Sequence, residues 1–403
     1  MKDAFSTKNV RSLVAVVSCP TYDFAVVEAA VHRGIQLIGG TDKFVHPNET
    51  IIFKPNVLWG TDPAKCVVTH PAVLRAVVKA FVDTSARLLY GDSSAGISRT
   101  IPSMEKCGYH HALDSLSVKI ASFDKSTEVL FPEGGVSKRL KIADAVVNAD
   151  GVINIPKLKS HGLTRMTGAV KNMFGCVPGL AKGEHHARFP DAYEFSRLLA
   201  DIAAFVRPRL HIMDAIEAME GNGPQSGTPK KLGVLLFSAD PVALDTVACR
   251  LIHLNPEFVP TIAAAERIGL GTSDTDFIEI IGDAIKPDHT FKVIRKPPER
   301  IPMTGILRGV REYFLSRPKI VPAKCTRCAR CVSVCPVTPR ALLQIGAKSI
   351  PKYNYQHCIR CYCCQEVCPS SAIEISQPLL KRLLPFGPYI SLLVTRSGSR
   401  QHR

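Results

Sequence analysis

The stretch CTRCARCVSVCP at residues 325–336 returns as CIRCYCCQEVCP at residues 358–369. Both copies follow the pattern Cys-x2-Cys-x2-Cys-x3-Cys-Pro, and every equivalent cysteine is offset by 33 residues. A duplicated segment of this kind predicts a small module built from two similar halves. The spacing of its cysteines indicates which inorganic group the module holds.

Three cysteines separated by two-residue gaps wrap a short loop around one face of an iron–sulfur cubane, and the fourth, before proline, binds the other cluster. Structural zinc also uses Cys-x2-Cys pairs, but it explains neither the third cysteine nor the proline. Cys363 corresponds to Arg330 in the first copy, so we expect a packed thiol there, with a redox role as the alternative. We therefore expect two [4Fe–4S] clusters, one held by Cys325, Cys328, Cys331 and Cys368 and the other by Cys358, Cys361, Cys364 and Cys335.

Positive charge is concentrated in the same part of the chain. Residues 292–403 contain 20 lysines and arginines against four acidic residues, which accounts for the whole formal charge of +16. An acidic redox partner would be steered to such a surface, although an ordinary solvated surface is the alternative. Nucleic acid is disfavoured, because a single Trp and 7% aromatic residues provide few stacking platforms. The bases near the cysteines are Lys324, Arg327, Arg330, Arg340, Lys348, Lys352 and Arg360.

From residue 11 to about residue 283, short apolar runs alternate with helix-length segments, as in an α/β domain with a mostly parallel sheet. Pro71 and Pro241 each suit a first helical turn, where the missing N–H costs nothing. The expected strands are 13–18, 50–53, 87–90, 151–155, 210–213, 232–237 and 277–281. The expected helices are 24–37, 71–82, 142–149, 192–206 and 241–253.

Polar residues follow five of these strands directly, and ligands of open parallel sheets bind at the carboxyl ends of strands. We therefore expect these residues to meet in one crevice, with lysines and helix N-termini favouring a small anionic ligand. Histidine and carboxylate side chains could transfer protons there. Asp214 and Asp240 belong to the same set, although Asp240 before Pro241 is also suited to cap a helix. The candidate catalytic residues are Lys54, His70, Asp92, Lys157, Lys159, His161, Lys171 and Glu217.

No Gly-rich nucleotide-binding motif occurs in the sequence. The adjacent histidines His185 and His186 could suggest metal, but a loop contact to ligand or solvent is the preferred interpretation. Residues 1–10 show no signal peptide, and no apolar run is long enough to span a bilayer. Together with the scattered remaining cysteines, this favours a reducing cytoplasm. The expected organisation is an α/β domain at 1–291, a basic, Pro-rich connection at 292–322 with a helix near 305–315, a cluster module at 323–376 and a basic, apolar tail at 377–403.

Several N-terminal segments together resemble one known family. They are Lys54-Pro55-Asn56, Thr69-His70-Pro71, Gly91-Asp92-Ser93, residues 156–161, 168–175 and 220–224, and Asp240-Pro241-Val242-Ala243. This set is similar to the DUF362 family, which is prokaryotic and often fused to a C-terminal 2[4Fe–4S] ferredoxin-like α+β domain. The resemblance implies iron–sulfur binding in the cytoplasm but no particular reaction, because the family as a whole lacks an assigned activity.

These observations leave three hypotheses for function. In the first, the chain is an oxidoreductase that couples its clusters to a small anion bound in the N-terminal domain. In the second, it is an electron carrier or adaptor whose N-terminal domain docks a partner protein. In the third, the basic C-terminal third binds nucleic acid. The tail could also lie on a membrane surface, but Pro385 and Pro388 interrupt any helix there, which favours packing onto the module.

Overall fold

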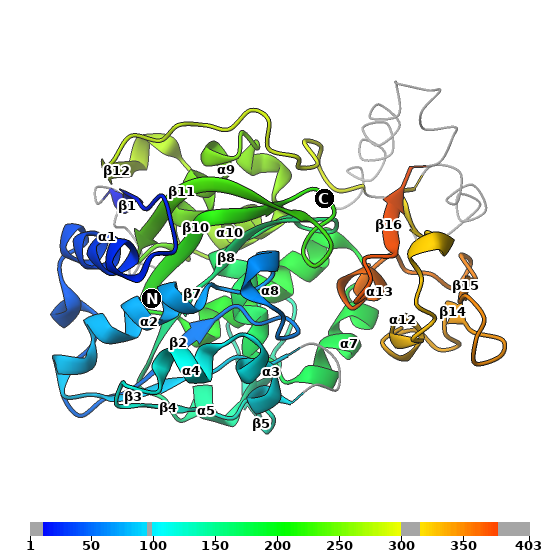
Figure 1. Ribbon diagram of the computed structural model, residues 1–403, viewed down its shortest axis with the longest axis horizontal. Coiled ribbons are helices and arrows are strands. Elements are labelled where there is room, and N and C mark those ends of the chain that lie inside the picture. The colour runs from blue at the N-terminus through cyan, green and yellow to red at the C-terminus, as the bar shows by residue number, and fades with distance from the viewer. Residues whose placement is uncertain (1–10, 95–98, 300–314, 378–403) are drawn as a thin grey trace, which may run out of the picture.

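A ten-stranded mixed sheet forms the centre of the N-terminal domain in the computed structural model, which describes residues 11–94, 99–299 and 315–377. Its main strands run in the order β12-β1-β11-β10-β7-β2-β3-β4, and β8 and β9 extend it beside β10 (Figure 1). The strands are β1 (Ser12–Ser18), β2 (Thr50–Pro55), β3 (Arg87–Tyr90), β4 (Val118–Ile120), β7 (Gly151–Ile155), β8 (Lys157–His161), β9 (Arg165–Thr167), β10 (Leu210–Glu220), β11 (Thr228–Ser238) and β12 (Ile278–Gly282).

Most neighbouring strands are parallel, which confirms the expected α/β class. The exception at the centre is β11, which is antiparallel to both β10 and β1. The long pair β10–β11 is a hairpin whose register shifts between Ala215 and Glu217. Its outer half extends past the rest of the sheet towards the C-terminal module (Figure 1). The expected strands at 210–213 and 232–237 were therefore too short at this end of the sheet.

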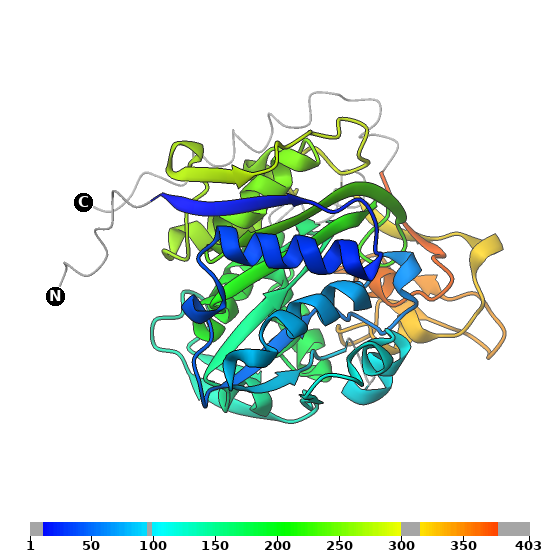
Figure 2. The same ribbon diagram turned by 60° about the vertical axis from the view of Figure 1, so that its left-hand side comes forward.

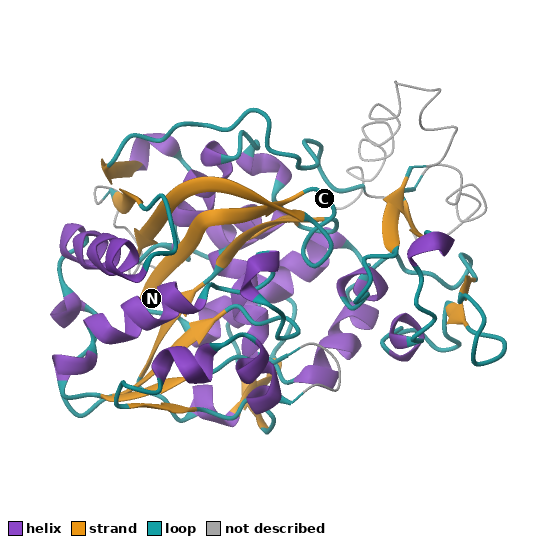
Figure 3. Ribbon diagram, in the orientation of Figure 1, coloured by secondary structure: helices purple, strands orange, loops and turns teal. Residues whose placement is uncertain are grey.

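Helices cover both faces of the sheet and enclose two apolar cores (Figure 3). Figure 2 shows α1 and α2 in front of one face, where Val31 and Leu74 are fully buried. On the other face α8, α9 and α10 bury Leu198, Val247 and Ala265. The helices are α1 (Phe24–Leu37), α2 (Pro71–Ala80), α3 (Thr100–Lys106), α4 (Tyr109–Leu113), α5 (Asp144–Val147), α6 (Ala169–Asn172), α7 (Gly179–Arg188), α8 (Ala192–Val206), α9 (Pro241–Leu251) and α10 (Pro260–Arg267).

Side-chain caps begin four of these helices where the sequence suggested a boundary. Asp23, Asp191 and Asp240 accept hydrogen bonds from backbone N–H groups at the starts of α1, α8 and α9. His70 caps α2 through its ring, and Pro71 occupies the first turn. Each cap satisfies N–H groups that have no partner within the helix.

The expected helix at 142–149 was wrong at its start. Residues Arg139–Ala143 form β6, which pairs with β5 (Ser126–Leu130) in a separate hairpin, and the helix begins only at Asp144. Leu140 and Ile142 are buried while Arg139 and Lys141 are exposed, which is a strand alternation. Residues 157–161, expected only as polar residues after the strand 151–155, themselves form a strand, β8.

The C-terminal module contains two short strand pairs and two short helices. The pairs are β13 (Arg317–Ile320) with β16 (Ile373–Ser376), and β14 (Leu342–Leu343) with β15 (Lys352–Tyr353); the helices are α12 (Arg330–Ser333) and α13 (Cys363–Glu366). Helix α13 lies towards the N-terminal domain, whereas α12 and the β14–β15 pair lie at the far end (Figure 1). The helix expected near 305–315 and the tail expected at 377–403 fall outside the described residues except for Leu315 and Gln377, and so do the first ten residues.

Candidate functional site

Two cavities in the module are each lined by four cysteines. The first is lined by Cys325, Cys328, Cys331 and Cys368. The second is lined by Cys335, Cys358, Cys361 and Cys364. In each set three cysteines come from one copy of the motif and the fourth from the other copy. Cys363 is buried and lines neither cavity.

The lining of both cavities fits a cubane cluster. Thiolates are the donors that iron–sulfur clusters use, and the remaining lining is largely apolar. Backbone N–H groups of Ala341 and Ala372 also donate to the sulfurs of Cys335 and Cys368, at 3.4 and 3.2 Å. Such hydrogen bonds stabilise negative charge on a ligating sulfur. Among the described residues no group of three or more His, Cys, Asp or Glu is arranged to hold a single metal ion.

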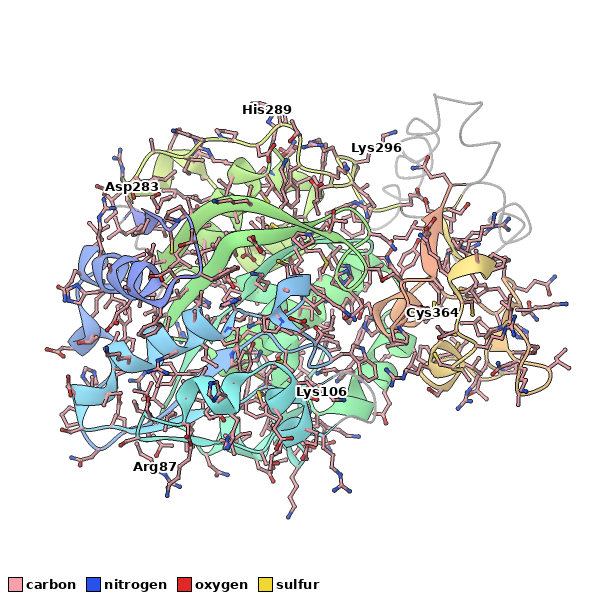
Figure 4. All side chains as sticks on the ribbon, viewed as in Figure 1. Arg87, Lys106, Asp283, His289, Lys296 and Cys364 are labelled. Carbon is pink, nitrogen blue, oxygen red and sulfur yellow. The ribbon has the colours of Figure 1, made fainter. Side chains whose placement is uncertain are left out.

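The two cavities differ in exposure. Cys358, Cys361 and Cys364 of the second cavity are each 7% exposed. By contrast Cys328 of the first cavity is exposed. Cys364 lies on α13, on the side of the module that faces the N-terminal domain (Figure 4). The second cavity is therefore the inner one and the first is the outer one.

A buried ion pair lies at the carboxyl ends of β2 and β3. Nζ of Lys54 is 2.8 Å from Oδ1 of Asp92, and both side chains are almost fully buried. The second oxygen of Asp92 accepts the backbone N–H of Val57 at 2.8 Å. The backbone at Gly175 passes so close that a Cβ atom there would lie 1.9 Å from Asp92 and 2.5 Å from Lys54.

A second buried group joins β8 to β10. Lys157 donates to Asp214 at 2.9 Å and to the hydroxyl of Tyr22 at 2.6 Å. That hydroxyl donates to the other oxygen of Asp214 at 2.9 Å, and the ring of Tyr22 stacks on His70 with centroids 3.7 Å apart. Glu217 lies at the partly exposed end of this group, where its carboxylate accepts from the thiol of Cys66 at 3.5 Å.

Lys159 is buried without a carboxylate. Its ammonium donates to Oδ1 of Asn56 at 2.6 Å and to the carbonyl of Val67 at 2.7 Å, and no described acidic residue lies within ion-pair distance. Burial, together with the nearby charge of Lys171, lowers the pKa of Lys159 to about 7. Lysine that is desolvated in this way binds a proton weakly and gains by contact with an anion.

Two more lysines of the same region have no ion-pair partner among the described residues. Lys171 on α6 lies over the ring of Phe195, with Nζ 6.0 Å from its centroid. Lys182 on α7 donates to the carbonyl and hydroxyl of Ser93 at 2.7 and 2.6 Å. Both are largely surrounded by protein, although some side-chain surface remains accessible, and burial lowers the pKa of each.

His186 was expected in a loop but lies on α7. Its ring is buried and stacks on Phe195 with centroids 4.3 Å apart. Nδ1 has no hydrogen-bond partner among the described residues. Burial lowers the pKa of His186 to about 4, so the ring is neutral at pH 7.

His161 connects this region to the module. Its Nε2 lies 3.0 Å from Oε1 of Glu366 on α13, and its Nδ1 accepts backbone N–H groups of Leu163 and Thr164 at 3.0 and 3.3 Å. Burial lowers the pKa of His161, so a neutral ring with its proton on Nε2 faces the Glu366 carboxylate. Beside it, the amide of Gln365 donates to Oδ1 of Asn222, and Asn222 donates to the carbonyl of Ile373 at 3.0 Å.

The structure brings the sequence-predicted residues together along one edge of the sheet. This edge runs from Glu217 and His70, through the Lys54 and Lys157 ion pairs, to Lys159, Lys171 and His161 beside the module. Asp240 does not join it: its carboxylate binds Ser12, the N–H of Thr272 and the start of α9. Arg360, expected among the surface bases, is buried.

Sequence reasoning missed Tyr22, Lys182 and Glu366. Glu366 had a signal, because it is one of only four acidic residues after Lys292 and lies between two cysteines. Tyr22 had only its position shortly after the expected strand 13–18, and Lys182 had none, since it lies in no expected element.

Comparison with known proteins identifies both parts of the chain. Residues 51–250 match the family described as a domain of unknown function, DUF362. The thylakoid-associated protein sll1697 of Synechocystis sp. is 36% identical over 259 residues, covering 64% of this chain and 79% of the relative. The chain belongs to the DUF362 family. Residues 317–369 of this DUF362 protein match a 4Fe-4S dicluster domain, which makes it an iron–sulfur protein.

A solved structure also resembles the DUF362 protein in part. The lactate racemase apoprotein of Thermoanaerobacterium thermosaccharolyticum is 13% identical with a TM-score of 0.38. The likeness covers 60% of this chain, which spans 57% of the racemase. In the described residues no helix is long and apolar enough to cross a membrane.

Proposed function

We propose that this DUF362 protein carries two [4Fe–4S] clusters and transfers single electrons through them. The ligands are Cys325, Cys328, Cys331 and Cys368 for the outer cluster, and Cys358, Cys361, Cys364 and Cys335 for the inner cluster. The observation that carries the proposal is the division of eight cysteines between two cavities, with one cysteine of each motif crossing to the other set. Clusters of this kind exchange one electron at a time.

Analysis of the protein purified without oxygen tests this directly. We expect about eight iron atoms and about eight sulfide ions per chain, four of each for every [4Fe–4S] cluster. The reduced protein should give an EPR spectrum of two interacting clusters. Zinc in place of iron, or a colourless protein without metal, contradicts the proposal.

We further propose that the chain is an oxidoreductase acting on a small anion, such as a carboxylate or phosphate. Lys159, Lys171 and Lys182 support this, because they place three ammonium groups without a described ion-pair partner at the carboxyl edge of the sheet. An anion there would supply the missing negative charge, which is worth more in a partly dehydrated site than in water. The unpartnered Nδ1 of buried His186 is available for a hydrogen bond in the same region.

The position of this site relative to the module supports coupling to the inner cluster. His161 and Lys171 lie beside α13, which carries Cys364 and Glu366. Binding and reaction of an anion at this edge would change the electrostatic field at the inner cavity first. The partly exposed His70 and Glu217, at the other end of the edge, are the side chains placed to exchange protons with solvent.

A binding screen with named probes tests the anion site. Inorganic phosphate, oxalate and succinate are titrated into the cluster-loaded protein by calorimetry, and the EPR spectrum is recorded with and without each. We expect binding of at least one probe, a change in the spectrum, and loss of binding in Lys159→Gln and Lys171→Gln. Lys79→Gln, which alters an exposed lysine paired with Glu28, is the control. Absence of binding, with both clusters present, favours the carrier or adaptor function instead.

For location, we propose the cytoplasm, on the basis of the many cysteines without a disulfide among the described residues. The Synechocystis relative is named for a thylakoid association, which is a different place. Fractionation of cells that express the tagged chain distinguishes the two, because a membrane-bound chain would sediment with the membranes.

A further inference from the structure

We infer that a small acidic one-electron carrier protein, of the flavodoxin or ferredoxin class, docks on the far end of the module. The docking surface, called here the outer surface, consists of Arg327, Cys328, Leu343, Ile345, Lys348 and Lys352. This inference rests on the proposed electron-transfer function and adds to it the place where electrons enter or leave the molecule.

Exposure of the cysteines identifies which end of the module meets the partner. Cys358, Cys361 and Cys364 of the inner cavity are buried, whereas Cys328 of the outer cavity is exposed. Figure 1 shows the β14–β15 pair at the end of the module away from the N-terminal domain. The rate of electron transfer between proteins falls with the distance between their redox groups. A partner should therefore dock where a sulfur ligand lies at the surface.

Hydrogen bonds fix the conformation of the outer surface. The side-chain amide of Gln344 donates to the carbonyl of Ser349 at 2.7 Å and to that of Arg327 at 3.2 Å. These bonds hold the turn that follows β14 against a segment that lines the outer cavity. Lys352 lies opposite Leu343 in the β14–β15 register. The turn that carries Ile345 and Lys348 is therefore held against the backbone of Arg327, the residue before Cys328.

The chemistry of this surface fits an acidic protein. Ile345 is 81% exposed and Leu343 is 52% exposed, so two aliphatic side chains stand in solvent without a described cover. Exposed arginines and lysines surround them, and the one exposed acidic residue of the described module, Glu374, is paired with Lys324 at 2.8 Å. A small apolar centre with a charged rim is the usual arrangement of a protein interface, and basic charge speeds the approach of an acidic partner.

An anionic membrane is the competing occupant. Two aliphatic side chains bury little apolar area, and membrane anchoring requires an extended apolar face in addition to basic residues. A lipid bilayer also has no redox group that would exchange electrons through an exposed cysteine ligand. A protein partner accounts for both features of the surface.

The electron balance of the encounter is simple. One electron leaves the reduced carrier, which is oxidised by one electron, and the outer site of this chain is reduced by one electron. No covalent bond forms or breaks between the proteins. The reverse encounter, with an oxidised carrier as acceptor, balances in the same way.

The test uses full-length, cluster-loaded protein and a recombinant acidic flavodoxin as the probe. Affinity is measured by calorimetry at low and high ionic strength, and oxidation of reduced flavodoxin is followed by stopped flow. We expect binding that weakens as salt rises, and a loss of about tenfold or more in Lys348→Glu/Lys352→Glu, because charge reversal replaces attraction with repulsion. Ile345→Ser should also weaken binding. Lys119→Glu, at an exposed position on β4 far from the module, is the matched control.

The outcomes separate this inference from the proposed function. Iron content and the EPR spectrum, measured on every variant, report whether the clusters are present independently of docking. Cluster-loaded protein that binds flavodoxin equally well with and without Lys348→Glu/Lys352→Glu overturns the inference. So does binding to phosphatidylglycerol vesicles, with loss in Ile345→Ser, when flavodoxin does not bind at all.

Discussion

Nε2 of His161 at the end of β8 lies 3.0 Å from Oε1 of Glu366 on α13. This contact joins the last residue of a sheet strand to the helix that carries Cys364, and both side chains are largely buried. The polar edge of the N-terminal domain therefore ends in direct contact with the module, instead of facing it across solvent.

Loss of this contact should loosen the module. His161→Ala leaves the Glu366 carboxylate buried without its main partner, and a lost hydrogen bond to a charged group costs about 1.5–3 kcal/mol. We expect the visible absorbance of the clusters to be lost at lower denaturant concentration than in the parent protein. His32→Ala, at an exposed histidine on α1, should leave the midpoint unchanged. An unchanged midpoint in His161→Ala contradicts the assigned role.

The Lys54–Asp92 pair should be costly to break from one side. Asp92→Asn leaves a buried ammonium without its carboxylate, and removal of one partner of a buried pair costs about 3–5 kcal/mol. The lost free energy of unfolding is measured by monitoring the unfolding of the N-terminal domain with circular dichroism. Glu28→Gln breaks the exposed pair with Lys79 and should cost less than about 1 kcal/mol. Equal losses in the two variants would show that Lys54 is solvated.

Two glycines should respond oppositely to the same substitution. Gly175→Ala forces a methyl group into the Lys54–Asp92 pair, so we expect a strong loss of stability. Gly183 lies within α7, where the nearest atom to an added Cβ is 4.0 Å away. Gly183→Ala should therefore stabilise the protein by about 0.5–1 kcal/mol through helix propensity. Thermal unfolding of both variants measures the contrast. A mild effect of Gly175→Ala would show that the Lys54–Asp92 pair does not lie against Gly175.

The crossed ligand sets predict which double variants keep one cluster. Cys325→Ser/Cys368→Ser removes two ligands of the outer set and should retain about four iron atoms, those of the inner [4Fe–4S] cluster. Cys361→Ser/Cys368→Ser removes one ligand from each set and should lose iron from both. Cys363→Ser is the control and should keep the full iron content. The reverse order of iron content in the two double variants would mean that the motifs do not cross.

Anion binding should weaken as pH rises through about 7. Burial and the charge of Lys171 lower the pKa of Lys159 to about 7, so its ammonium loses its proton above that value. Because the unfolded lysine keeps its proton up to its ordinary value of 10.5, the unfolded state binds more protons between these values. Stability of the ligand-free protein should therefore rise with pH in that window. Calorimetric titration of phosphate or a carboxylate at several pH values, with Lys159→Gln as the comparison, measures the dependence. Binding that stays constant from pH 6 to pH 9 contradicts it.

Local sequence patterns predicted the bounds of a helix well where a capping residue and an apolar stripe mark that helix. Phe24–Leu37 and Ala192–Val206 form helices with the expected bounds, because an aspartate caps each start and an apolar stripe faces the sheet. The reversed direction of β11 had no local signal, since strand direction depends on the connection and not on the composition of the strand. The same holds for β8, because its lysines are polar in the sequence and only the folded chain supplies the distant partners among which they are buried.

The sequence by itself determined the cysteine spacing, the duplicated module, the excess of basic residues around it and the polar residues that follow the strands. These are properties of neighbouring residues, and the chemistry of a short motif does not depend on the rest of the fold. Only the tertiary structure decided that Glu366 meets His161, that no carboxylate of the described residues lies beside Lys159, and that one cysteine cavity faces inwards while the other faces solvent. Such pairings join residues separated by up to about two hundred positions, and burial, which sets their charge and strength, exists only after the chain has packed.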